Sequence, residues 1–388
     1  MGTLSAVCTP DAPPRWGGRP GLGAAAERLP PRPIECRYTS RRVVCAGCTG
    51  VKCLAAASPV VPHLLPDARV GSAGGVVNDL VRYRDLIADS ARWEGFPFRA
   101  DDIIINTPSK SGTTWMQTLC AMLVFDSIEF GRPLTEISPS LEMQINNRAE
   151  VIASLEAQQH RRFIKSHTPL DGVPVAEGVT YVCVARDPRD VALSFQHHRA
   201  NLDRDAFMAA RARAVGLSDL KEFGPPPGPL PEDPLERFWL WAYADAGTFA
   251  GQALVDVLHH VQTFWDRRHH PQVCLFYYSD LLADLPGQLR RLADALSIDA
   301  TGERIEQFAA AATFSRMKER AEDLAPEVGN QIWRSNREFF HRGCDGQWRE
   351  LLDDEGLRRY EHRVAELVPP DVAAWAHPSW LAPRLAGQ

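Results

Sequence analysis

The chain has 388 residues, of which 45% are hydrophobic and 24% are charged, a composition typical of a soluble globular protein. Its net charge is 43 − 49 = −6, which argues against a broad nucleic-acid-binding surface and so against a nucleic acid partner. No run of about 20 uncharged apolar residues occurs, so the sequence predicts no transmembrane segment.

Residues 1–75 differ in composition from the rest of the chain. They hold 10 of the 30 prolines, 10 of the 27 glycines and five of the nine cysteines, without a periodic apolar pattern. We interpret them as a mostly disordered extension or an over-long gene model. Cys45, Cys48 and Cys53 form C-x2-C-x4-C, and even with Cys36 or His63 this spacing matches no usual zinc site. The remaining cysteines are scattered, which indicates reduced thiols and a cytoplasmic protein.

Residues 76–388 are predicted to form one folded domain of alternating helices and strands. In chain order the predicted elements are a helix over 78–93, strands over 102–106, 161–167 and 179–185 with helices over 115–125 and 187–198, a strand over 272–281, helices over 286–296 and 302–320, the second with a break near its end, and a helix over 354–367. Asp187 suits the N-cap of its helix and Pro188 the first position. Residues 200–236 contain "GPPPGPLPEDP" and are interpreted as a long connection, of the kind that serves as a lid or specificity loop.

Uninterrupted apolar strands followed by helices predict an α/β fold of three αβα layers around a central parallel sheet. Ligands of such sheets bind at the carboxyl ends of the strands. Lys110, His167 and Arg186 each follow a predicted strand directly. We therefore expect these three side chains at one binding site.

The stretch "DIIINTPSKSGTTW" is a strand, a polar loop and the start of a helix. Backbone N–H groups, hydroxyls and the ammonium of Lys110 at a helix N-terminus all favour an anion, and Gly112 allows a close approach. The usual phosphate loop has a Gly-Lys-Ser/Thr order, whereas Lys110 here precedes Ser111 and Gly112. The alternative is an ordinary polar loop with an exposed lysine.

Three further motifs carry polar side chains suited to the same ligand class. Arg186 and Ser194, eight residues apart, suit a phosphate dianion, although a structural bridge from Arg186 to Asp187 or Asp190 is equally compatible. His167, before a turn at Thr168-Pro169, is a candidate general base, although an isolated histidine is more often structural. Arg342-Gly343 in "FFHRGCDGQW" suggests a tight basic loop, with a plain glycine turn as the alternative.

Together the four motifs resemble, in order and context, the sulfotransferases that use 3'-phosphoadenosine-5'-phosphosulfate (PAPS). "TPSKSGTTW" resembles that family's 5'-phosphosulfate loop, "VCVARDPRDVALS" its 3'-phosphate segment, "RRFIKSHTPL" its catalytic-histidine segment and "FFHRGCDGQW" its C-terminal glycine loop. The run "QQHRRFIKSHTPLDG" is especially similar to bacterial glycolipid-type members. The resemblance covers roughly residues 78–375 and implies the family's P-loop-NTPase-like sulfotransferase fold.

The resemblance also implies a role for each matching residue. His167 would be the base, with Lys110 at the leaving phosphate and Lys165 positioning the sulfuryl group. The remaining implied ligands of PAPS are Ser111, Gly112, Thr113 and Thr114 at the 5'-phosphate, Trp115, Tyr278 (or its neighbour Tyr277), Thr313 and Phe314 near adenine, and Arg186, Ser194, Arg342 and Gly343 at the 3'-phosphate. No metal ion is implied. The implied acceptor is the hydroxyl of a hydrophobic or lipid-linked alcohol, with a small phenol as second choice.

The sequence departs from the family pattern at two places, and two other functions are considered as alternatives. His341 stands where the family usually has arginine, which predicts a lower or pH-dependent 3'-phosphate affinity. Asp353-Asp354 replaces the Thr-Val of the family's dimer motif, so that dimer is not expected although another oligomer is possible. A small-molecule kinase with a P-loop-like site and a non-catalytic nucleotide-binding protein are the rivals. The other histidines, including His197-His198 and His269-His270, are interpreted as surface or helix-end residues.

Overall fold

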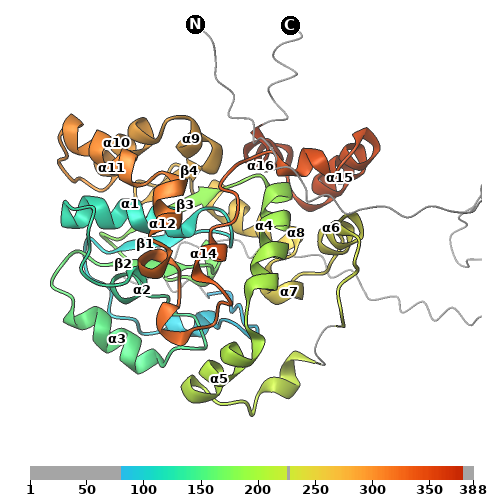
Figure 1. Ribbon diagram of the computed structural model, residues 1–388, viewed down its shortest axis with the longest axis horizontal. Helices are drawn as coiled ribbons and strands as arrows, with labels where there is room; N and C mark the ends of the chain where they lie inside the picture. The colour runs from blue at the N-terminus through green and yellow to red at the C-terminus, as the bar shows by residue number, and fades with distance from the viewer. Residues whose placement is uncertain (1–79, 225–227, 379–388) are drawn as a thin grey trace, which may run out of the picture. The chain divides into compact units, whose positions relative to one another are not determined.

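The computed structural model describes residues 80–224 and 228–378, so the predicted extension and its five cysteines lie outside the described residues. The described part contains a four-stranded, all-parallel sheet with the order β2-β1-β3-β4 (Figure 1). Its strands are β1 (Ile103–Asn106), β2 (Phe163–Ser166), β3 (Thr180–Ala185) and β4 (Val273–Tyr277). Within the described ranges, none of the helices is long and apolar enough to cross a bilayer.

The strands form at the apolar runs because both faces of the sheet are covered. β1 begins with three consecutive isoleucines, all fully buried, and such β-branched side chains favour extended backbone. Ile104 pairs with Ile164 on one side and with Tyr181 on the other. A strand buried on both faces cannot alternate apolar and polar residues, which explains the uninterrupted apolar pattern.

Helices cover the sheet on both faces and complete the three predicted layers. On one face, α1 (Thr113–Phe125), α10 (Leu285–Ala295) and α11 (Gly302–Ala311) pack around Ile105 and Val184. On the other face, α3 (Arg148–Ala157) and α8 (Leu254–Trp265) pack with Ile104 and Tyr181. The predicted three-layer α/β fold is confirmed.

A separate apolar cluster joins helices beside β4. It is built from α4 (Pro188–Asn201), α6 (Pro234–Ala242), α8, α15 (Asp354–Leu367) and α16 (Pro370–Ala376). Figure 1 shows α15 and α16 in red close to α6. The remaining described helices are α2 (Leu134–Ile137), α5 (Arg204–Ala214), α7 (Thr248–Gly251), α9 (Tyr278–Ala283), α12 (Phe314–Glu319), α13 (Ala321–Leu324) and α14 (Asn336–Phe339), with 3₁₀ turns at Ser90–Trp93, Leu170–Gly172, Leu220–Phe223, Val328–Asn330 and Gln347–Glu350.

Several predicted elements are confirmed together with the local signals that predicted them. Asp187 caps α4 by accepting a hydrogen bond from the N–H of Arg189, and Pro188 is the first helical residue. The helix predicted over 302–320 is interrupted at residues 312–313, where α11 ends before α12. The helix predicted over 354–367 is α15, with identical bounds.

The helix predicted over 78–93 is wrong, because only Ser90–Trp93 is helical in the described part of that range. Polar side chains compete there with helical backbone bonds. The carboxylate of Asp85 accepts from the N–H groups of Ile87 and Ala88, which turns the chain locally. Residues 84 and 89 then form an isolated antiparallel bridge.

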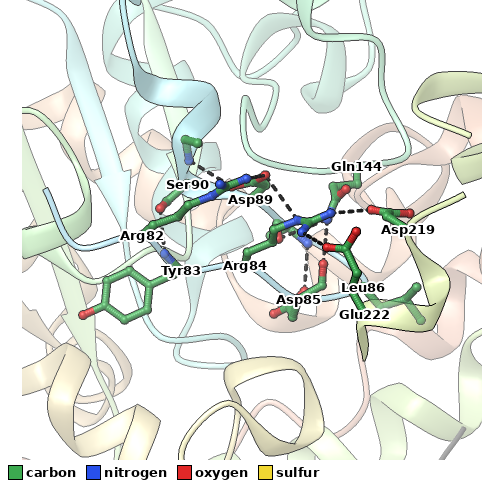
Figure 2. A network of polar contacts seen from close by, with 12 residues as sticks. Arg82, Tyr83, Arg84, Asp85, Leu86, Asp89, Ser90, Gln144, Asp219 and Glu222 are labelled. Atoms are coloured by element: carbon green, nitrogen blue, oxygen red, sulfur yellow. Dashed lines mark hydrogen bonds and ion pairs between the residues drawn. The ribbon is translucent and has the colours of Figure 1, made fainter. Parts of the chain in front are cut away.

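Long-range ion pairs hold this segment in place, as Figure 2 shows. The Arg84 guanidinium lies 2.7 Å from Asp219 and 2.6 Å from Glu222, and 3.6 Å from Asp89. The Arg82 guanidinium lies 2.7 Å from Asp89. The apparent amphipathic pattern therefore reflects tertiary ion pairing across distant segments, which a helical period does not reveal.

Two further predictions need correction. The connection predicted over 200–236 contains the helix α5, and the start of α6, on either side of residues 225–227, which are not described. Arg211 on α5 is fully buried, with its guanidinium 2.9 Å from Asp219 and 3.1 Å from the carbonyl oxygen of Leu86. The strand predicted over 272–281 ends at Tyr277, because Tyr278 already begins α9.

The buried ion pair of Arg162 and Asp102 joins the residue before β2 to the residue before β1, and its contribution to stability can be tested. Both side chains are fully buried, and Asp102 also accepts from the N–H of Arg99 at 2.8 Å. Arg162→Met leaves Asp102 buried without its counter-charge, so we expect a loss of about 3–5 kcal/mol in the free energy of unfolding, measured by urea denaturation. Arg290→Met breaks an exposed pair with Glu306 and should cost less than about 1 kcal/mol. Equal losses for the two variants would contradict this interpretation.

Candidate functional site

The strand order places a ligand site between the carboxyl ends of β1 and β3. The chain leaves β1 toward β2 on one side and leaves β3 toward β4 on the other, so the connections diverge between these two central strands. A crevice outside the strand ends at such a switch point is the usual ligand site of open α/β sheets. The loop after β1 and Arg186 after β3 meet here, since the Arg186 guanidinium donates to the carbonyl oxygen of Lys110 at 3.2 Å. Two predicted site residues are thus brought together.

The loop after β1 ends in a left-handed residue that starts α1. Gly112 has a φ of +106°, and a Cβ there would lie 3.0 Å from the ring of Tyr278. The first N–H groups of α1, at Thr113, Thr114 and Trp115, have no acceptor within the helix, as at any helix start. The Ser111 hydroxyl is buried and has no hydrogen-bond partner among the described residues. These donors, together with the positive end of the helix dipole, suit an anion.

The ammonium of Lys110 lies among aromatic rings and other cations. Its Nζ is 3.2 Å from Nδ1 of His198 and 4.3 Å from the ring centroid of Phe339. Burial, with Arg186 and Lys165 nearby, lowers the pKa of Lys110 to about 7. Additional negative charge at this position would therefore stabilise the protonated lysine.

His198 was expected to be a surface or helix-end residue; it does lie in the last turn of α4, but its ring is turned inward. His198 and His197 are adjacent on α4 and so point about 100° apart. His198 lies between Lys110, Trp333 and Phe339, and burial followed by the charge of Lys110 lowers its pKa well below the usual value. A neutral His198 can accept a hydrogen bond from the Lys110 ammonium. A two-histidine run cannot indicate in advance which ring turns inward.

The guanidinium of Arg186 is buried and has partners from the C-terminal glycine loop. It lies 3.2 Å from the Asp345 carboxylate and 2.7 Å from the carbonyl oxygen of Cys344. The sequence also allowed a structural bridge from Arg186 to Asp187 or Asp190, and the structure shows the pairing with Asp345 in its place. Asp187 is paired with Arg189, and Asp190 accepts a hydrogen bond from the N–H of Gly346 at 2.7 Å. Ser194 lies half-buried two turns into α4.

Two aromatic residues flank the loop, and they distinguish Tyr278 from Tyr277. Trp115 and Tyr278 meet edge to face with ring centroids 5.4 Å apart, and the Arg186 guanidinium lies 4.3 Å from the Tyr278 ring. Tyr277 points to the opposite side, where its hydroxyl donates to the carbonyl oxygen of Ala376 at 2.9 Å. Tyr278 is therefore the tyrosine beside the loop. The Trp115 indole N–H is buried and finds no acceptor in the part of the chain that the structure describes.

The C-terminal residues of the predicted site divide into a close pair and a more distant arginine. Gly343 has a φ of +66°, and a Cβ there would overlap the ring of Phe314. Phe314 is the first residue of α12, and the exposed Thr313 is the N-cap of that helix. Arg342 is exposed and lies 3.6 Å from the Glu350 carboxylate. The structure thus brings Phe314 to Gly343 but turns Arg342 toward solvent.

His341, which replaces the expected arginine, stacks on His197 with ring centroids 3.7 Å apart and 23° between the planes. Burial, His197 and Arg342 lower the pKa of His341 to about 4. Ligand atoms of His197, His341 and Glu338 lie within 4.8 Å of one another, so these residues are a possible metal-holding group. Near-parallel rings do not direct their in-plane lone pairs at a common ion, so the arrangement suits ring stacking better than metal coordination.

The ring of His167 has a defined orientation at the end of β2. Its Nδ1 lies 2.8 Å from the carbonyl oxygen of Thr107, which can only accept, so Nδ1 carries the proton and Nε2 has the free lone pair. Burial, then Lys165, His260 and Lys110, lower the pKa of His167 to about 3, against the raising effect of Thr107. The imidazole is therefore neutral over the physiological range.

Lys165 is buried at the end of the same strand. Burial lowers the pKa of its ammonium, while the carboxylates of Glu327 and Glu142 oppose this effect. Its charge also contributes to the lowered pKa values of His167 and Lys110. The three predicted catalytic side chains therefore lie close enough to interact electrostatically.

Glu142 is a site residue that the sequence analysis missed. Its buried carboxylate accepts from the N–H of His167, from Oγ of Ser166 at 2.8 Å and from Oγ1 of Thr168 at 3.0 Å. The Trp93 indole donates to it as well, at 2.9 Å. Glu142 therefore fixes the backbone that carries His167. A single glutamate between apolar residues in "SLEM" gives no local signal of this role.

Comparison with known proteins gives consistent matches over most of the chain. Residues 100–368 match the family model described as sulfotransferase domain. A glycolipid sulfotransferase of Mycobacterium bovis is 42% identical over 313 residues, covering 78% of this chain and 95% of the relative, and a glycolipid sulfotransferase of Mycobacterium tuberculosis is 42% identical over 312 residues with the same coverage. Human sulfotransferase 1E1 is 23% identical over 308 residues, or 75% and 92% of the two chains.

Solved structures share the fold at low sequence identity. Retinol dehydratase, in a complex with retinol and PAP, aligns with a TM-score of 0.55 and 23% identity, over 72% of this chain and 85% of that one. Mouse sulfotransferase SULT7A1, complexed with PAP, aligns with a TM-score of 0.55 and 18% identity, over 75% of this chain and 92% of that one.

The orientation of His167 generates a prediction for the free protein. Because its pKa is lowered from 6.5 to about 3, the ring should remain neutral, with the proton on Nδ1, from pH 8 down to pH 5. Two-dimensional ¹H–¹⁵N spectra of the imidazole nitrogens measure this, and His167→Asn assigns the signals. A titration midpoint near 6.5 in the folded protein would contradict the burial described here.

Proposed function

The chain belongs to the sulfotransferase family, and on that premise we propose that it transfers the sulfuryl group of PAPS to a hydroxyl of a glycolipid and releases adenosine 3',5'-bisphosphate. The observation that carries this proposal is the free Nε2 of His167, held in a cluster with the cations Lys110 and Lys165. A nucleotide-binding protein without catalysis needs cations but has no use for an oriented neutral imidazole.

The residues present fit an anionic donor. The unpartnered Ser111 hydroxyl and the N–H groups at the start of α1 would hold the 5'-phosphate. Trp115, Tyr278 and Phe314 offer aromatic surface for the adenine, with Thr313 at its edge. Arg186, Ser194 and the Arg342-Gly343 loop would hold the 3'-phosphate, and Arg342 must turn from Glu350 to contribute. No metal ion is part of this proposal.

The chain's own side chains then have defined tasks in the transfer. The acceptor hydroxyl attacks sulfur, the new O–S bond forms, and its proton passes to Nε2 of His167. The bond from sulfur to the phosphate oxygen breaks, and that oxygen keeps the electron pair. Lys110 stabilises this developing charge, and Lys165 orients the sulfuryl oxygens. The negative donor also offsets the cations that lower the pKa of His167, which makes the imidazole a better base.

The acceptor class rests on the mycobacterial relatives, whose names specify glycolipids. A buried apolar cluster of Met143, Ile145, Phe207 and Ile332 lies between the segment after Glu142 and the long connection. A cytoplasmic setting belongs to the same proposal, and the free thiols of Cys120, Cys183 and Cys274 are compatible with it.

Two measurements test the proposal as a whole. Adenosine 3',5'-bisphosphate should raise the melting temperature, because at 100 times its dissociation constant it adds about 2.7 kcal/mol to the free energy of unfolding. ATP with Mg²⁺ should not raise the melting temperature. Transfer of ³⁵S from labelled PAPS should occur to glucosylceramide in preference to 4-nitrophenol. Stabilisation by Mg²⁺-ATP alone would favour the kinase, and stabilisation without any transfer would favour a non-catalytic binder.

Replacement of Lys110 tests the leaving-group assignment. Lys110→Ala should lower kcat by about 10²–10³-fold, because a cation at developing charge acts mainly in the transition state. Lys221→Ala on the exposed Leu220–Phe223 turn is the matched control and should retain full turnover. If kcat of Lys110→Ala stays within about threefold of the wild type, the loop assignment is wrong.

Replacement of His167 separates catalysis from donor binding. His167→Asn should reduce sulfuryl transfer by about 10²–10⁴-fold, the usual contribution of a general base, while the affinity for adenosine 3',5'-bisphosphate stays nearly unchanged. Single-turnover assays and calorimetry measure the two quantities. Parallel loss of both would identify a donor ligand or structural residue, and full turnover would eliminate the proposed mechanism.

A further inference from the structure

A polar cluster of Asn146, Glu327 and Asn330 lies near the catalytic lysine of β2 and has no part in the chemistry described above. The Glu327 carboxylate accepts from the side-chain amides of Asn146 at 3.1 Å and Asn330 at 3.2 Å. The two asparagines are themselves joined, Asn330 donating to Asn146 at 2.9 Å. We refer to these three residues as the Glu327 cluster.

The Glu327 cluster lies at the reacting end of the molecule. Asn146 follows Glu142 by four residues, and Glu142 holds the backbone N–H of His167. The same segment runs along the end of β2, where the N–H of Lys165 donates to the carbonyl oxygen of Pro139 at 3.1 Å. Among the carboxylates, Glu327 has the largest effect on the pKa of the Lys165 ammonium, which it raises.

The backbone at the Glu327 cluster is held firmly from outside. Glu327 and Gln331 adopt left-handed conformations, with φ of +59° and +52°, which non-glycine residues rarely occupy. Arg92 donates to the carbonyl oxygens of Met143 at 2.6 Å and Asn146 at 2.7 Å, and the Trp333 indole donates to that of Pro326. Such conformations persist where surrounding contacts enforce them, and they are frequent at ligand sites.

The chemistry of the Glu327 cluster matches vicinal hydroxyls. Glu327 is 7% exposed, and both hydrogen bonds from the asparagines go to one oxygen, Oε2, so Oε1 accepts no hydrogen bond from the described residues. The two amides supply donors and acceptors at the same place, and an ionised acceptor strengthens a hydroxyl hydrogen bond. Ile145 directly precedes Asn146 and Ile332 lies two residues after Asn330, and both side chains belong to the same buried apolar cluster. A polar group next to an apolar wall suits an amphiphile.

We propose that Asn146, Glu327 and Asn330 form a subsite for the sugar hydroxyls of the acceptor and so select a glycosylated acceptor over a plain alcohol. This inference rests on the proposed function. The Glu327 cluster orients the sugar so that one hydroxyl faces His167 and Lys165, while the apolar cluster takes the hydrocarbon part. A plain alcohol leaves the buried Glu327 carboxylate without its added partners.

The test compares two acceptors that share an alkyl chain, octyl β-glucoside and octanol. Glu327→Gln should lower kcat/KM for octyl β-glucoside about 10–100-fold, as for loss of a hydrogen bond to a charged group, with octanol changed by less than about twofold. Asn330→Ala is a second variant with the same expected direction. Glu322→Gln is the matched control, since exposed Glu322 pairs with Asn336 at 2.8 Å outside the site.

The outcomes separate this inference from the function on which it rests. Equal losses for the two acceptors would show that Glu327 acts on the chemistry through Lys165, and no loss would show that it does not contact acceptor; either overturns the sugar subsite. Saturation-transfer NMR of octyl β-glucoside, with adenosine 3',5'-bisphosphate present, measures binding without turnover. Sugar binding that depends on Glu327, in a protein that transfers nothing, would support the subsite and reject the sulfotransferase proposal.

Discussion

The accumulation of buried positive charge at one end of the sheet governs the rest of the site. Lys110, Lys165 and Arg186 approach each other at the carboxyl ends of three parallel strands, away from water. Like charges in a low dielectric repel strongly, and desolvation adds to this cost. The protein tolerates the arrangement because carboxylates and rings are placed against each cation, and because an anionic ligand would relieve the remaining repulsion.

Each cation is compensated in a different way. Arg186 has a direct ion pair with Asp345, and its flat guanidinium faces the ring of Tyr278. Lys165 is influenced at longer range by Glu327 and Glu142, which also hold the side chains around it. Lys110 has only a neutral imidazole and an aromatic face as its described close partners. The least compensated cation is thus the one proposed to meet the leaving phosphate.

The sequence predicted the parts of the fold that depend on local order. Isoleucines 103–105 indicated a buried strand, Asp187-Pro188 a helix start, and strand-end positions placed Lys110, His167 and Arg186 at one edge. It failed where distant residues decide the outcome. The expected helix is broken by a local turn at Asp85 and by ion pairs of Arg84 with residues far along the chain. The inward turn of His198 depends on the position of Lys110.

The same limit applies to the residues that support the site. Glu142, Glu327 and Asp345 are single acidic residues, and each has a partner far along the chain: His167, Asn146 and Arg186, respectively. Tyr277 and Tyr278 could not be distinguished until the end of β4 was known, because a shift of one residue reverses the side of the sheet. Spacing identifies a ligand loop, but the counter-charges behind it follow from tertiary packing.

The segment from α14 to the glycine loop touches two of the cations at once. Phe339 lies over Lys110, and Cys344 and Asp345 hold Arg186. An anion that draws Lys110 away from Phe339 and one that competes with Asp345 for Arg186 act on the same short stretch of chain. The two ends of the proposed nucleotide donor would therefore be thermodynamically linked through residues 339–345. A fragment of that ligand that binds at only one of the two cations must displace the contacts of this segment without help from the other end. Its measured affinity will therefore be lower than the contribution that the same group makes within the whole ligand.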